Sequence, residues 1–211
     1  MVTDSVALGS GEFPAEFAAS SVPLERRGAR LDARLEALRA LWSGEPVTRH
    51  SEVIDAQGAV LDVVPQPPIP IWVGGRSAAA QRRAGRFGDA WMPFVVTPER
   101  FAEGWAKVRA EAEHHGRDPD ALVPTLQLWG QFDDDLAKAL TTIAARIEAS
   151  YRTPFERFER YTVYGDADMW VERLGAFVEA GVRHFNFVFA GGDRLAQLAR
   201  VATEVVPRLR A

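Results

Sequence analysis

The sequence contains no cysteine, no long apolar run and no excess of basic residues. The lack of cysteine excludes disulfide bonds, thiolate metal sites and cysteine nucleophiles. No apolar stretch approaches the roughly 18 residues of a membrane-spanning helix, and the N-terminal residues MVTDSVALGS lack the basic and apolar regions of a secretory signal. The net charge of −4 argues against a nucleic-acid-binding face, which is usually basic. We therefore expect a cytoplasmic protein with neither a membrane nor a nucleic-acid partner.

The chain does have the composition of a globular domain. Its 211 residues are 47% hydrophobic and 26% charged, which is close to the globular average and sufficient for a sizeable core. The sequence shows no internal repeat and no low-complexity linker. We therefore expect a single domain over residues 1–211.

Several segments show helical periodicity. The clearest helix is expected over residues 23–42, where five apolar side chains share one face: Leu24, Leu31, Leu35, Leu38 and Trp42. Another helix is expected over residues 97–116, with Thr97 as its N-cap and Gly116 just past its end. Residues 47–63 are β-branched and polar around Gln57-Gly58, which indicates a hairpin.

Short apolar strands alternate with helices along most of the chain, which predicts βα units and a parallel sheet. Five strands are expected, centred near Val6, Ile71, Trp91, Leu126 and Phe187. An open doubly wound sheet usually carries G-x-G-x-x-G after its first strand, whereas this chain reads G-S-G-E-F-P. A closed barrel needs eight units and about 250 residues. The fold class that we predict is therefore α/β, an incomplete TIM (β/α) barrel with a small hairpin insertion.

The chain resembles the bacterial luciferase-like superfamily of flavin- or deazaflavin-dependent oxidoreductases. The most specific stretch is PQPPIPIWVGGRSAAAQRRAGRFGDAWMP, which has the family's order of proline-rich lead-in, apolar strand, Gly-Gly, small-residue helix and Gly-Asp-x-Trp. VALGSGEFPAEF, RGARLDARLEALRALW and YTVYGDADMWVERLGAFVEAGVRHFNFVF also resemble family segments. Family members carry about three further strand–helix units before the point that matches residue 1. The five strands expected in this chain and the three further units of the family add up to the eight of a full barrel.

The corner Val73-Gly74-Gly75-Arg76-Ser77 lies where an expected strand meets a helix. Two glycines let a ligand approach the backbone closely, and the N-terminus of a helix favours an anion. Arg76 adds a positive charge, and Ser77 can cap the helix or bond to a phosphate. A tight turn with a serine cap and a solvated arginine is the structural alternative. The resemblance implies that this corner holds the cofactor phosphate.

The stretch Gly9-Ser10-Gly11-Glu12 follows the first expected strand, at the end where barrels place their catalytic groups. Deazaflavin-dependent sugar-phosphate dehydrogenases of the superfamily carry a similar Gly-x-Gly-Glu, with the glutamate as acid or base beside the cofactor. The resemblance therefore implies Glu12 as the catalytic residue and Ser10 and Gly11 as cofactor contacts. Their pattern has asparagine where this chain has Ala15, so one polar contact differs. The structural alternative is that Glu12 only precedes a helix and stabilises its dipole.

Other polar residues are better explained by structure. His184 and Asn186 lie near the start of the last strand, far from the mouth of a barrel, and we expect them to be satisfied structurally. His114-His115 closes a helix, and Asp133-Asp134-Asp135 begins one, which suits the helix dipole in both cases. We predict no metal site.

The resemblance implies an oxidoreductase that uses coenzyme F420, which we favour, or FMN. It would transfer hydride to or from a small organic substrate, or oxygenate that substrate. The alternatives are a non-catalytic cofactor-binding or partner-binding remnant of the family and a truncated gene product. The strands near Val6 and Phe187 would lack a neighbour, and bare strand edges attract other chains. We therefore expect a homo-oligomer or a complementing chain.

Overall fold

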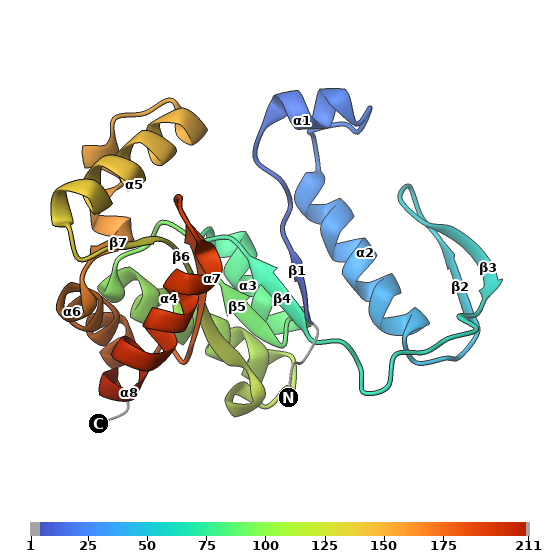
Figure 1. Cartoon of the computed structure of the whole chain (residues 1–211). Coiled ribbons are helices and arrows are strands. Elements are labelled where there is room, and N and C mark those ends of the chain that lie inside the picture. Colours follow the sequence, from blue (N-terminus) through green and yellow to red (C-terminus); the bar gives the residue numbers. More distant parts are fainter. Residues whose placement is uncertain (1–4, 210–211) are drawn as a thin grey trace. The chain divides into compact units, whose positions relative to one another are not determined.

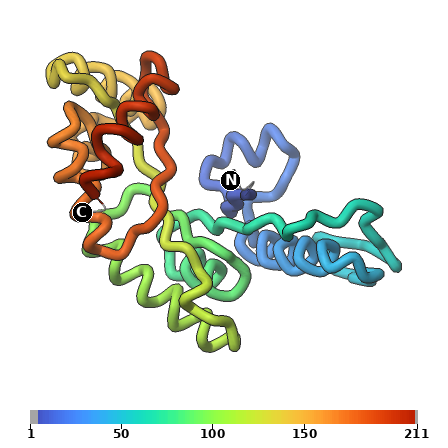
Figure 2. The backbone as a smooth tube through the Cα atoms, turned by 60° about the horizontal axis from the view of Figure 1, so that its bottom comes forward, coloured from blue at the N-terminus to red at the C-terminus, as the bar shows by residue number. Residues whose placement is uncertain are grey.

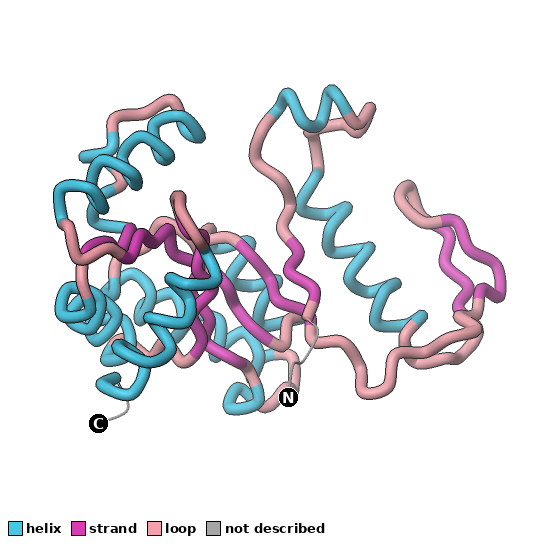
Figure 3. Tube along the Cα trace, in the orientation of Figure 1, coloured by secondary structure: helices cyan, strands magenta, loops and turns pink. Residues whose placement is uncertain are grey.

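The computed structural model describes residues 5–209. It comprises two compact units, the first formed by Met1–Trp91 with Val108–Leu122, and the second by Met92–Lys107 with Val123–Ala211. Figure 1 and Figure 3 show that strands and helices alternate within each. The expectation of one domain over residues 1–211 remains a prediction.

Three strands of the first unit are neighbours in one sheet, in the order β1, β4 and β5. They comprise β1 (Val6–Leu8), β4 (Ile71–Gly74) and β5 (Ala90–Met92), whose last residue lies in the second unit. β1 and β4 are parallel, with Val6 opposite Ile71 and Leu8 opposite Val73. Three of the five predicted strand centres are thereby confirmed.

The helices of the first unit follow these strands. They are α1 (Pro14–Ala19) and α2 (Arg27–Leu41) after β1, α3 (Ala78–Phe87) after β4, and the C-terminal part of α4 (Pro98–His114). A 3₁₀ turn, Pro119–Ala121, ends the unit. The backbone trace in Figure 2 shows α2 running beside the hairpin strands.

In the second unit, β6 (Val123–Phe132) pairs in parallel with β8 (His184–Phe189) and with β7 (Thr162–Gly165). This confirms the strands expected near Leu126 and Phe187. Its helices are α5 (Leu136–Tyr151), α6 (Ala167–Glu179), α7 (Arg194–Arg200) and α8 (Val206–Leu209). Two 3₁₀ turns, Phe155–Arg157 and Glu159–Tyr161, precede β7, and a π-helical turn, Val201–Val205, joins α7 to α8.

The core of the second unit contains an aromatic cluster around Trp170 of α6, which is fully buried. The Trp170 ring lies 5.2 Å from that of Phe187 and 6.2 Å from that of Phe189. The alternate residue Asn186 instead lies near Gln127 and Met92. The phenylalanines of β8 thus face the helices, and Asn186 lies on the opposite face of the strand, as the alternation of the sequence predicts.

Some of the local structure predicted from the sequence is wrong. Residues 162–165 form β7, which is not among the five strands expected from the sequence. The hairpin of β2 (Val47–His50) and β3 (Asp55–Ala59) turns at residues 51–54 instead of Gln57-Gly58. Its turn is held by the Ser51 hydroxyl, which accepts the N–H groups of Val53 and Ile54. Gly58, at φ +61°, lies in β3 beside a register irregularity, so it serves a bulge and not the turn.

The long helix begins later than the sequence predicts, at Arg27 instead of Pro23. Arg26 adopts φ +54°, and the guanidinium of Arg30 donates to the carbonyls of Pro23 and Glu25. These side-chain bonds hold residues 23–26 in a turn before the helix, which leaves Leu24 outside it. Pro14–Ala19 forms the short helix α1.

Tyr164 of β7 gives a testable electrostatic prediction. Burial and the hydrogen bond from its hydroxyl to Glu159 raise its pKa to about 12. Because this pKa exceeds the unfolded value near 10, the associated stability is present below pH 10. That stability is lost as the pH rises towards 12. In a titration followed at 295 nm, the step above pH 11 is expected to disappear in Tyr164→Phe. A wild-type titration that is complete by pH 11 would contradict this assignment.

Candidate active site

The two predicted cofactor segments leave adjacent strands at the same edge of the sheet. Because Leu8 pairs with Val73 in a parallel register, Gly9 and Gly74 follow as neighbours at the carboxyl ends of β1 and β4. Gly9 to Glu12 extend from one strand, and Gly75 to Ser77 from the other. The two segments that the sequence singled out therefore leave the sheet at the same edge.

The Gly74-Gly75 corner has a backbone that only glycine adopts without strain. Gly75 has φ +109°, and a Cβ placed on it would lie 2.9 Å from the Cβ of Ala80 in α3. The indole Nε1 of Trp91 donates to the Gly75 carbonyl oxygen at 2.8 Å. The corner is thus held by Trp91 on one side and packed closely against α3 on the other, so a side chain at Gly75 would strain it.

Ser77 and the first turn of α3 supply the polar groups of the corner. The Ser77 Oγ accepts the Ala80 N–H at 3.3 Å, which confirms the serine cap. The first N–H groups of a helix have no acceptor within it, so those of Ala78 and Ala79 are available to an anion. Arg76 is exposed at the same corner, and its carbonyl oxygen accepts from Gln81 at 3.5 Å. Val73 is fully buried, so only its backbone can contact a ligand.

Glu12 lies on the loop between β1 and α1 and is exposed. The preceding Gly11 has φ +76°, and a Cβ there would lie 2.7 Å from the ring of Phe17. The Gly11 carbonyl oxygen accepts a bond from the Arg27 Nε at 3.2 Å. Ser10 is half-buried. The loop is thus fixed at Gly11, and the next carboxylate projects into solvent.

Asp89, the acid of the Gly-Asp-x-Trp motif, has a structural role that the sequence alone did not reveal. Its Oδ2 accepts from the Ile71 N–H at 2.7 Å and from Arg39 at 2.6 Å. Arg117 lies 3.7 Å from its other oxygen and donates to the carbonyls of Gly85 and Gly88. Burial lowers the pKa of Arg117, and the Asp89 carboxylate opposes that effect. Asp89 therefore fixes the start of β4, the strand that ends at the glycine corner.

Replacing Asp89 with asparagine keeps the shape of the side chain but removes the charge that faces both arginines. We expect Asp89→Asn to lower the free energy of unfolding by about 1.5–3 kcal/mol, the range for hydrogen bonds to charged groups. Urea unfolding followed by circular dichroism measures the change. Asp62→Asn, at an exposed position, is the control. Equal stability of the two variants would show that Asp89 has no such role.

The acidic run before α5 is used in structural contacts. Asp135 caps the helix by accepting the Lys138 N–H, and Asp133 pairs with the Lys138 ammonium at 2.7 Å. Asp134 bonds to both terminal nitrogens of Arg200. These contacts lower the pKa values of Asp133 and Asp134. Over residues 5–209, no group of three or more His, Cys, Asp or Glu side chains could hold a metal ion.

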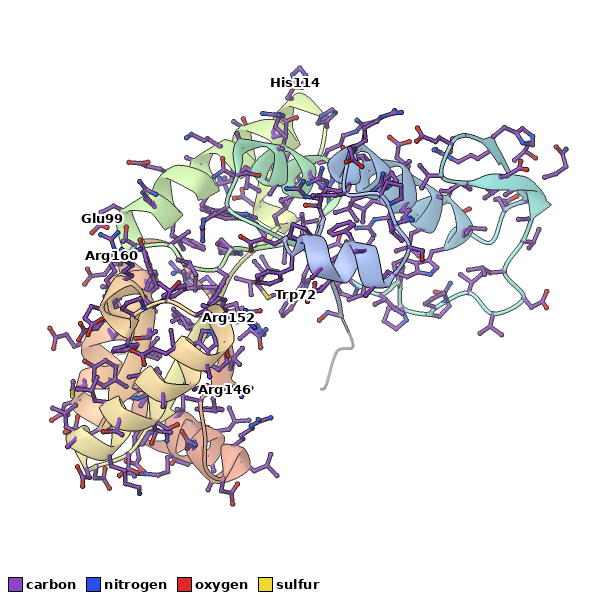
Figure 4. The ribbon with its side chains drawn as sticks, turned by 90° about the horizontal axis from the view of Figure 1, so that it is seen from above. Trp72, Glu99, His114, Arg146, Arg152 and Arg160 are labelled. Carbon is purple, nitrogen blue, oxygen red and sulfur yellow. The ribbon has the colours of Figure 1, made fainter. Side chains whose placement is uncertain are left out.

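Asn186 and the histidines that the sequence singled out also have roles in the structure. Burial lowers the pKa of His184. The Asn186 amide nitrogen lies 3.5 Å from the Gln127 Oε1 and 3.6 Å from the Met92 Sδ. His114 ends α4, and the ring of His115 contacts Glu111 at 3.2 Å. Figure 4 shows His114 at the tip of the helix, pointing outward.

A family model described as luciferase-like monooxygenase matches residues 5–159. The chain belongs to the luciferase-like monooxygenase family. The resemblance noted in the sequence is thus confirmed. Among the helices of residues 5–209, none is long and apolar enough to cross a membrane.

This luciferase-like chain is similar to several dehydrogenases named as F420-dependent and to a ketoreductase. An F420-dependent glucose-6-phosphate dehydrogenase of Gordonia bronchialis is 28% identical over 232 residues, covering 96% of this chain and 68% of the dehydrogenase. A phthiodiolone/phenolphthiodiolone dimycocerosates ketoreductase of Mycobacterium tuberculosis is 32% identical over 143 residues, which cover 64% of this chain and 37% of that protein. The chain spans only 62–68% of the length of the dehydrogenases.

Solved structures confirm the predicted fold class. An F420-dependent secondary alcohol dehydrogenase in complex with an F420-acetone adduct matches 98% of this chain and 70% of its own, with a TM-score of 0.85 and 22% identity. The monooxygenase RslO1 from Streptomyces bottropensis matches with a TM-score of 0.78 and 20% identity, over 96% of this chain and 68% of its own. The luciferase-like chain is thus an α/β fold that corresponds to an incomplete TIM barrel with a small hairpin.

Proposed function

We propose that this chain binds coenzyme F420 at the carboxyl ends of β1 and β4 and takes part in hydride transfer to or from a small organic substrate. The observation that supports the proposal is the parallel register of Leu8 with Val73, because the loops that carry Glu12 and the glycine corner then leave β1 and β4 at the same edge of the sheet. F420-dependent relatives over most of the chain support the choice of cofactor. Catalytic groups at the carboxyl ends of barrel strands are the rule in this fold.

The residues of the corner fit a phosphate group. A Cβ at Gly75 would lie 2.9 Å from that of Ala80 in α3, so glycine lets the backbone of the corner approach the first turn of the helix closely. The N–H groups of Ala78 and Ala79 and the guanidinium of Arg76 would hold the phosphate, with Val73 and Gly74 contributing backbone. Ser77 fixes the first turn through its bond to Ala80.

A bound deazaflavin supplies the hydride chemistry, and the protein supplies position and proton transfer. Ser10 and Gly11 would contact the cofactor from the loop after β1, with Gly11 fixed by Arg27. The carboxyl group of Glu12 would give a proton to the substrate oxygen, or take one from it. A ring placed over this exposed carboxylate would exclude water from the place where the proton is exchanged.

FMN with dioxygen is the alternative chemistry, since monooxygenases share the fold. The dependence of turnover on oxygen distinguishes hydride transfer from monooxygenation. We expect reduction of F420 by substrate under anaerobic conditions, followed at 420 nm, with the same rate in air. Turnover only with reduced FMN, accompanied by oxygen consumption, would replace hydride transfer with monooxygenation.

A non-catalytic, cofactor-binding or partner-binding role is the second candidate. It is favoured by the exposure of Glu12, whose carboxylate projects into solvent in the structure. Binding of F420 without turnover, across a panel of alcohols and sugar phosphates, would select this candidate.

A further inference from the structure

A cavity of about 510 Å³ lies beside β7 in the second unit. It is lined by β7, by the two 3₁₀ turns that precede this strand and by one face of α6. Three of the lining residues, Val163, Met169 and Ala176, are apolar. The volume is within the range of small-molecule sites, about 300–1,000 Å³. No lining residue belongs to the Gly74 to Ser77 corner or to the loop of Glu12, so the cavity is separate from the candidate active site.

Arg173 of α6 brings a guanidinium group to this cavity. Its Nε donates to the Thr162 carbonyl oxygen at 3.2 Å, whereas its Nη2 is buried and has no hydrogen-bond acceptor within residues 5–209. Burial lowers the pKa of Arg173, and the charge of Glu99 opposes that effect. A second arginine of the lining, Arg160, is exposed (Figure 4). Because an unsatisfied buried donor is costly, the Arg173 guanidinium favours a ligand that supplies an anionic acceptor.

Carboxylates line the same cavity. Glu159 is already engaged, because it accepts the hydroxyl of Tyr164 at 2.7 Å. Glu156 and Glu172 are exposed, and neither forms an ion pair in the part of the chain that the structure describes. These two acids repel a ligand that carries only negative charge and attract one that also carries an ammonium group.

We propose that this cavity binds an α-amino acid with an apolar side chain. The ligand carboxylate bonds to the guanidinium of Arg173, whose planar fork suits a carboxylate. The ligand ammonium group faces Glu156 and Glu172, and the ligand side chain packs against Val163 and Met169. A zwitterion matches the cavity because Arg173 and the two glutamates offer opposite charges that form no ion pair within residues 5–209.

Calorimetric titration of the full wild-type chain tests the charge requirement. Leucine is compared with isocaproate, which lacks the ammonium group, and with isopentylamine, which lacks the carboxylate. We expect leucine to bind, and each analogue to bind at least tenfold more weakly. Failure of leucine, methionine and phenylalanine alike to bind at millimolar concentration would overturn the proposal. Equal affinity for leucine and either analogue would also overturn it.

Two variants assign the charges to their residues. Arg173→Met and Glu156→Gln/Glu172→Gln are each expected to lower leucine affinity at least tenfold. Arg173→Met is also expected to lose the preference for leucine over isopentylamine, and the double variant the preference over isocaproate. Arg157→Met and Glu179→Gln, at exposed positions that do not line the cavity, are the matched controls and are expected to bind leucine as wild type does.

Leucine binding that is unchanged in both variants would place the ligand elsewhere and overturn the proposal. The comparison of leucine with its analogues uses the wild-type chain, so it remains decisive if Arg173→Met does not fold. None of these measurements uses F420, so they are separate from the test of the proposed function.

Discussion

Glu12→Gln is expected to lower turnover with F420 by about 10²–10⁴-fold, the usual contribution of general acid–base catalysis. Glutamine keeps the length and hydrogen-bonding capacity of the side chain but cannot exchange a proton near neutral pH. Cofactor affinity is expected to remain within about threefold of wild type, because the phosphate is held at the other loop. Steady-state kinetics and a fluorescence titration measure the two quantities separately.

Glu16→Gln is the matched control for this variant, since Glu16 is also exposed and lies four residues further along. It is expected to leave turnover unchanged. Full turnover in Glu12→Gln would remove Glu12 from the mechanism.

Gly75→Asp is expected to weaken F420 binding at least tenfold, or by about 1.4 kcal/mol. The aspartate places a negative charge against the phosphate. It also places a Cβ 2.9 Å from that of Ala80 at φ +109°, a backbone conformation that disfavours any side chain. The dissociation constant is measured by quenching of F420 fluorescence.

Gly75→Ala separates these two causes, because it introduces the Cβ and the backbone strain without the charge. We expect its loss of affinity to be smaller than that of Gly75→Asp, and the difference to shrink at high salt. Thermal unfolding of both variants measures how far each substitution lowers the stability of the protein. Unchanged binding in a folded Gly75→Asp protein would show that the phosphate lies elsewhere.

The candidate site could be predicted from the sequence because its signals are local. Gly74-Gly75 and Ser77 mark the end of a strand and the start of a helix, and the structure has both there. The supporting contacts could not be predicted in the same way. Asp89 bonds to Ile71 and Arg39, which are 18 and 50 residues away, so no local pattern reveals the network. The bond from Trp91 to the Gly75 carbonyl is equally non-local.

The errors in the fold have similar causes. β7 is a strand of four residues whose pairing with β6 depends on the tertiary structure. Because two 3₁₀ turns precede it, hydrophobic periodicity in this region does not indicate a strand. In the hairpin, Gln57-Gly58 indicates a turn because Gly tolerates a positive φ, but a bulge uses the same property. The hydroxyl of Ser51 decides where the chain reverses.

The central claim is that the corner at Gly74 to Ser77 holds the cofactor phosphate. An anaerobic fluorescence titration of the wild-type chain with F420, and with the deazaflavin chromophore that lacks the phosphate-bearing tail, tests this directly. We predict at least tenfold tighter binding of F420, and loss of that preference in Gly75→Asp. Equal affinity of the wild-type chain for the two compounds, or a preference that survives in Gly75→Asp, would contradict it.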